Sequence, residues 1–167
     1  MGLSAENEVN TFVIHFETNP TLEDAAHLTA TNGAQALRLT TLVPAAPTRR
    51  VINEQSCSGC SAGVGQYRVE LDTSGNAQRY FLNALQGRDA TAGNIVASVV
   101  DSAPSSPATG TFTVTLQPSV GAATTVVFNK GQTSSGGTVN LAGAGVTALR
   151  TGVQTISYTD SGPVWGQ

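Results

Sequence analysis

The sequence predicts an all-β protein, an antiparallel β-sandwich of roughly a dozen short strands. Apolar and polar residues alternate with a period of two along many short stretches, which is typical of half-buried strands. Turn-forming Gly, Asn, Asp and Ser residues separate these stretches. Charged residues make up only 11% of the chain, so long helices held by salt bridges are not expected.

The alternation is clearest in residues 11–17, which place Phe12, Ile14 and Phe16 on one face of a strand. Residues 66–72 and 111–117 repeat the pattern. Each of these strands is expected to bury its apolar face and expose the other. The remaining expected strands are 27–31, 35–43, 49–53, 79–86, 94–100, 124–130, 137–143, 146–150 and 153–158.

Turns are expected where residues tolerate a positive φ or hydrogen-bond their own backbone. These positions are Thr31–Gly33, Ser74–Asn76, Gly87–Asp89, Asn129–Gly131 and Ser135–Gly137. One short helix is expected over residues 21–28, after Pro20, because Glu23 and Asp24 would be favourable in its first turn.

The chain is expected to form a single module over residues 1–167. Residues 101–110 are rich in Pro and Ser, so they could divide it into two stacked subdomains, 1–100 and 111–167. A long surface loop within one sandwich is the simpler interpretation.

The charge pattern argues against two classes of partner. The formal net charge is −3, and Lys130 is the only lysine, so the basic surface of a nucleic-acid-binding protein is not expected. No apolar run is long enough for a membrane span. Because the chain is poor in Lys and rich in Thr, Ser and Gly, we expect a secreted, periplasmic or cell-surface bacterial protein whose signal peptide lies outside this chain.

Both cysteines, Cys57 and Cys60, lie in the stretch CSGC. A redox centre of this spacing needs a helix N-terminus beneath it, and a strand is expected instead. A structural zinc site needs a second pair of ligands, and the chain has only two histidines. A local disulfide in an oxidising compartment is therefore expected, with free thiols as the alternative.

A family resemblance emerges in two stretches, residues 13–52 and residues 67–89. The first contains TLVP at residues 41–44, and the second contains YFLNAL at residues 80–85. In this order and separation they resemble the C-terminal β-rich region of the heparinase II/III-like polysaccharide lyases. The resemblance covers residues 9–89, about half of the chain.

The resemblance implies a β-sandwich and a polysaccharide context. In that family a preceding helical toroid carries the catalytic residues, and nothing in this sequence matches a toroid. No catalytic residue is therefore carried over, and the chain itself is not expected to be an enzyme. His15 and His27 lack the spacing of a metal motif.

The sugar-binding candidates are aromatic rings, which stack on sugar faces, and arginines, which bind carboxylates through a bidentate fork. They are Trp165, Tyr158, Tyr80, Arg68 and Arg79. No cofactor or metal site is expected. A calcium ion held by turn aspartates is the alternative, although no segment has the dense acidic pattern of a calcium loop. The candidate aspartates are Asp72, Asp89, Asp101 and Asp160.

The sequence thus predicts a non-catalytic carbohydrate-binding or accessory module beside a neighbouring catalytic domain. Its partner would be a polysaccharide, either uronic-acid-containing or from plant cell walls. The alternatives are a purely structural or adhesive surface domain, and a lyase fragment that is inactive without its helical domain.

Overall fold

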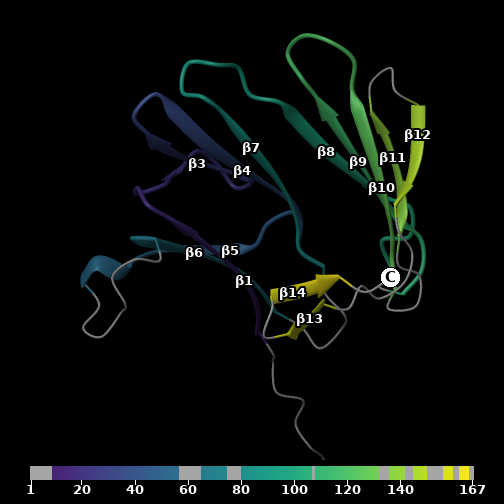
Figure 1. Cartoon of the computed structure of the whole chain (residues 1–167), viewed down its shortest axis with the longest axis horizontal. Coiled ribbons are helices and arrows are strands. Elements are labelled where there is room, and N and C mark those ends of the chain that lie inside the picture. The colour runs from purple at the N-terminus through teal and green to yellow at the C-terminus, as the bar shows by residue number, and fades with distance from the viewer. Residues whose placement is uncertain are drawn as a thin grey trace, which may run out of the picture.

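The fold is all-β, and its sheets are antiparallel, as the sequence predicts (Figure 1). This computed structural model describes residues 9–56, 65–74, 80–106, 108–131, 136–141, 145–149, 156–159 and 162–165. Three sheets of three, four and five strands and one two-stranded ribbon account for its strands.

The first sheet has three strands in the order β1-β6-β5. They are β1 (Val9–Phe16), β6 (Tyr67–Ser74) and β5 (Thr48–Asn53), and a short 3₁₀ helix, η1 (Glu54–Ser56), follows β5. Ile14 lies opposite Val69, and Phe12 lies opposite Leu71. The apolar residues of both strands therefore share one face, as the alternation predicts.

The second sheet has four strands in the order β2-β3-β4-β7. They are β2 (Thr21–Leu22), β3 (His27–Asn32), β4 (Gln35–Val43) and β7 (Leu82–Asp89). A two-residue loop joins β3 to β4, and Gly33 begins it with a φ of 59°. Glycine reaches this left-handed φ without the steric cost of a side chain.

Two local predictions in this sheet are wrong. Residues 21–28 form β2, a turn and the start of β3 instead of a helix, because the Asp24 carboxylate accepts the backbone N–H groups of Ala26 and His27 and closes the turn. The turn expected at Gly87–Asp89 is the end of β7, which pairs with the start of β4 up to Asp89 opposite Gln35.

The first and second sheets pack face to face around one apolar core. Its fully buried side chains are Leu28 and Leu39 from the second sheet and Val69 and Leu71 from the first. At one end of the sandwich, the rings of Phe12 and Phe81 stack with centroids 6.0 Å apart.

The third sheet is a simple meander with the strand order β12-β11-β10-β9-β8. Its strands are β8 (Val96–Asp101), β9 (Thr111–Gln117), β10 (Thr124–Asn129), β11 (Gly137–Leu141) and β12 (Gly145–Leu149). Strand β8 contacts β4, so this sheet lies beside the second sheet and away from the first (Figure 1). Residues 101–110 connect β8 to β9, which are paired neighbours in this sheet.

Only one face of the third sheet is well buried. Phe112 and Val114 of β9 are each 5% exposed, whereas Val96 and Val100 on the opposite face of β8 are each 66% exposed. The two-stranded ribbon consists of β13 (Ile156–Thr159) and β14 (Gly162–Trp165). The strands predicted from alternation are all present, whereas β2 and β14 are not anticipated by the sequence pattern.

Candidate functional site

A cleft opens at the end of the two-sheet sandwich, and the side chains of the second sheet explain it. Three successive cross-strand rows on its inner face change from three leucines, through a row whose two outer residues are small, to polar residues. The rows are Leu28, Leu39 and Leu85; then Ala30, Leu37 and Gly87; then Asn32, Gln35 and Asp89. The middle row leaves room above the core because Gly87 carries no side chain.

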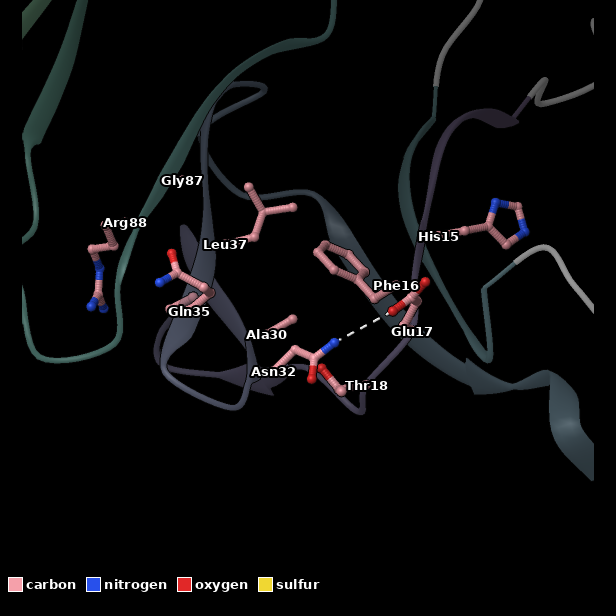
Figure 2. A pocket seen from close by; sticks show the side chains of 11 residues that line it. His15, Phe16, Glu17, Thr18, Ala30, Asn32, Gln35, Leu37, Gly87 and Arg88 are labelled. Atoms are coloured by element: carbon pink, nitrogen blue, oxygen red, sulfur yellow. Dashed lines mark hydrogen bonds between the residues drawn. The ribbon is translucent and has the colours of Figure 1, made fainter.

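Strand β1 supplies the opposite wall of the cleft. Its last residue, Phe16, is 4% exposed and forms part of the apolar core. Glu17 and Thr18 follow it at the rim. The cleft has a volume of about 400 Å³, and Figure 2 shows Phe16, Leu37 and Ala30 around its apolar floor.

Polar side chains form the rim. The Asn32 amide donates to the Glu17 carboxylate at 3.4 Å, which links the two sheets across the opening. The Gln35 amide donates to Asp89 at 2.9 Å. An apolar floor with carboxylate and amide groups at its edge can hold a small amphipathic molecule and hydrogen-bond its hydroxyl groups.

Two lining residues, Arg88 and His15, turn their side chains away from the cleft. Figure 2 shows Arg88 on the far side of β7 from Phe16, where its Nη1 donates to the carbonyl oxygens of Asp89 and Ala90. His15 points to the outer face of β1, and its Nε2 lies 3.3 Å from Glu54.

The outer face of the first sheet carries a chain of ion pairs that includes the predicted sugar-binding residue Arg68. Its Nη1 lies 2.7 Å from Glu54, and its Nε lies 3.0 Å from Glu70. Arg50 in turn pairs with Glu70 at 2.8 Å and with Asp72 at 2.7 Å. The guanidinium of Arg68 is therefore engaged by carboxylates of the protein itself.

Tyr80 lies where the sandwich meets the third sheet. Its hydroxyl oxygen accepts the backbone N–H of Gly131 at 2.7 Å. Its ring meets Phe112 edge to face, with centroids 5.2 Å apart. Neither Tyr80 nor Arg68 is among the described residues that line the cleft.

The same junction buries the only lysine of the chain. Lys130 is 2% exposed, and its ammonium donates to both Asp101 oxygens and to the Ala103 carbonyl oxygen. The ammonium also lies 5.0 Å from the centroid of the Phe112 ring. The Lys130 ammonium, with further help from the Ala103 N–H, holds the pKa of Asp101 below its usual value.

The turn between β2 and β3 contains two perturbed carboxyl groups. The backbone N–H of Ala26 and then the ring of His27 lower the pKa of Asp24 to about 2. The Thr29 hydroxyl and the guanidinium of Arg38 lower the pKa of Glu23. Hydrogen bonds that favour the charged form of a carboxyl group lower its pKa in this way.

The other candidate residues are only partly described. Tyr158 lies on β13 opposite Pro163, and Trp165 lies on β14 opposite Ile156. The structure describes the backbone at Tyr158 and Trp165 and not their side chains. Arg79, Cys57, Cys60 and Asp160 lie outside the described residues, so the roles proposed for them remain predictions.

The described candidate aspartates lie on strands and not in turns as expected, with Asp72 within β6, Asp89 at the end of β7 and Asp101 at the end of β8. Each has a protein partner. Asp72 pairs with Arg50, Asp89 accepts from Gln35, and Asp101 pairs with Lys130. In the part of the chain that the structure describes, no three His, Cys, Asp or Glu side chains come together as a metal site would require.

Within the described residues we also find no helix with the length and apolar character of a transmembrane segment.

The cleft residues were not identified from the sequence. Asn32 could be noticed only as part of an expected turn, and Gln35 and Glu17 as polar residues at strand ends. The cleft depends on which residues of β3, β4 and β7 lie side by side, and a single sequence does not reveal this register.

Comparisons with protein-family models, curated proteins and solved structures found no match to this chain.

Proposed function

We propose that this protein is a non-catalytic carbohydrate-binding module and that a sugar occupies the cleft at the end of its sandwich. The observation that carries the proposal is the amphipathic lining of the cleft. Phe16, Leu37 and Ala30 form an apolar floor, and Glu17 and Asn32 meet above it. A pyranose ring has the matching character, because its C–H groups form an apolar face and its hydroxyl groups point outward.

The dimensions are compatible with a short segment of a glycan. A volume of about 400 Å³ lies at the lower end of the range for ligand pockets. The rim residues Glu17, Asn32 and Gln35 are exposed, so their hydrogen bonds compete with water. Affinity should therefore be weak, with a Kd of roughly 0.1–1 mM for one site.

The wider context rests on the family resemblance. We propose an accessory module of an exported bacterial polysaccharide-active protein, located beside a catalytic domain of the lyase type. In this arrangement the module would bind a cell-wall glycan and so keep the neighbouring domain close to the polymer on which that domain acts.

Affinity electrophoresis tests the binding proposal directly. The protein should be retarded in gels that contain at least one of hydroxyethyl cellulose, mannan, hyaluronan, heparin or alginate. The variant Gly87→Leu should lose the retardation, because a Cβ at Gly87 meets no atom within 4 Å and the added side chain would occupy the cleft. Leu85→Ala, a change to a 52% exposed neighbour on the same strand, is the matched control and should bind like the parent.

Two outcomes would redirect the proposal. If Gly87→Leu binds normally and Trp165→Ala or Tyr158→Ala does not, the sugar site belongs to the β13–β14 ribbon. If no polysaccharide retards the protein, a structural or adhesive role takes precedence. The exposed Val96 and Val100 on the outer face of the third sheet would then be the first surface to examine for a neighbouring domain.

A further inference from the structure

We infer that the cleft selects uncharged sugars over uronic acids and that Glu17 is the residue that discriminates between them. This inference rests on the proposed function, because it concerns the ligand of the same cleft. It narrows the possible partners from polysaccharides in general to neutral ones.

Glu17 provides the negative charge at the opening. It directly follows Phe16, the aromatic residue of the floor, and its carboxylate lies at the rim on the side of Asn32. Among the described residues its carboxylate has one polar contact, the Asn32 amide at 3.4 Å. An amide does not neutralise a carboxylate, so the charge of Glu17 faces any ligand that enters.

The described cations are all engaged elsewhere. Arg88 is the one cationic side chain among the described residues lining the cleft, and it binds the backbone carbonyl groups on the far side of β7. The other described cations bind carboxylates or carbonyl groups outside the cleft. They are Arg38, Arg49, Arg50, Arg68 and Lys130.

These charges have opposite consequences for the two kinds of sugar. The carboxylate of a uronic acid would lie near Glu17 without a cation to compensate it, and like charges a few ångströms apart repel. A neutral sugar presents hydroxyl groups instead. Neighbouring hydroxyl groups can donate to the Glu17 carboxylate and accept from the Asn32 amide, so the same pair of side chains would bind them.

Pairs of oligosaccharides that differ only in the charge of the sugar test this preference. β-1,4-Mannotetraose and β-1,4-tetramannuronate differ only at C6, which is a hydroxymethyl group in one and a carboxylate in the other. Cellotetraose and the corresponding tetraglucuronate form a second such pair. In NMR or calorimetric titrations at low ionic strength, the neutral member of a binding pair should have a Kd at least about fivefold lower. The difference should shrink as salt screens the exposed charge.

Two variants identify the responsible residue. Glu17→Gln keeps the size and a hydrogen-bonding oxygen, so it should still bind the neutral sugar, and the preference over the uronate should fall to less than twofold. Arg88→Met should leave the preference unchanged. The inference is overturned if the parent protein binds the uronate as well as the neutral sugar, or if Glu17→Gln keeps the full preference.

The inference and the proposed function fail in different ways. If the parent prefers the uronate and Arg88→Met removes that preference, Arg88 is the discriminating residue and the cleft remains a sugar site. If neither member of either pair nor any polysaccharide in the gels binds, the proposed function fails and the inference fails with it.

Discussion

The Nζ atom of Lys130 lies 2.8 Å from one carboxylate oxygen of Asp101 and 2.9 Å from the other. Lys130 directly follows β10, Asp101 ends β8, and the two flank Phe112 of β9. A third hydrogen bond from the same ammonium to the Ala103 carbonyl oxygen ties in the loop after β8. The buried Lys130 ammonium therefore links the ends of β8 and β10 on either side of Phe112, where the third sheet meets Tyr80.

Loss of that cation should destabilise the protein. Lys130→Met should lower the free energy of unfolding by about 2 kcal/mol, because it removes three charge-assisted hydrogen bonds from a buried site. Urea unfolding followed by circular dichroism measures this change. Arg50→Met is the matched control: the Arg50 side chain is 57% exposed, and loss of a surface ion pair should cost less than about 1 kcal/mol. Equal losses in the two variants would contradict the structural role of Lys130.

Two glycines should respond to alanine in opposite directions. At Gly87 a Cβ meets no atom within 4 Å, so Gly87→Ala should stabilise the strand by about 0.4–1 kcal/mol through the unfolded state. At Gly137 the φ is 148° and a Cβ would overlap the carbonyl oxygen of Val127, so Gly137→Ala should destabilise. Thermal unfolding of the two variants tests the contrast, and a lower Tm for Gly87→Ala would disprove the open space beside β7.

Two leucines that lie opposite each other on β4 and β7 should differ sharply in their contribution to the stability of the fold. Leu39 is fully buried, whereas its cross-strand neighbour Leu85 is 52% exposed. Leu39→Ala should cost about 2–5 kcal/mol, since it deletes buried methyl groups and leaves a cavity. Leu85→Ala should cost less than about 1 kcal/mol. Chemical denaturation of both variants checks the assignment of the core, and a similar cost for both would place the core elsewhere.

Asp24 should make stability depend on pH at the acidic end. Its folded pKa of about 2 lies below the ordinary value of 3.8. Its charged form therefore favours the folded state above about pH 4, and this contribution is lost as the pH falls toward 2. Asp24→Asn should thus be less stable than the parent at neutral pH, and the difference should narrow toward pH 2. A difference that is independent of pH would show that the carboxylate charge is unimportant in this turn.

The fold class could be predicted from the sequence because strand alternation is a local signal. Phe12, Ile14 and Phe16 lie on the buried side of β1 as expected. The predicted helix over residues 21–28 failed because the acidic residues that favour a first helical turn also favour an Asp-capped turn, and pairing of β3 with β4 decided between them. The turn predicted at Gly87 was wrong because Gly is read as a turn residue, and its lack of a side chain leaves no apolar or polar alternation to indicate that it belongs to a strand.

The candidate site was less predictable for a related reason. Tyr80 and Arg68 have side chains that can bind sugars, but both already have partners that come from other parts of the chain. The Tyr80 hydroxyl binds Gly131, and the Arg68 guanidinium binds Glu54. Composition identifies groups that can bind a ligand. Only the three-dimensional neighbours decide whether those groups are already occupied.

Because the single lysine is buried, chemical labelling of its amine can show when the structure around it opens. Amine-reactive reagents have few targets in a chain with one lysine, and that amine is 2% exposed and held by three acceptor atoms. Acylation of Lys130 should therefore proceed only when this end of the third sheet opens and the hydrogen bonds to Asp101 and Ala103 break. The rate of that labelling, followed by mass spectrometry in native buffer, would measure how often this end of the third sheet opens under native conditions.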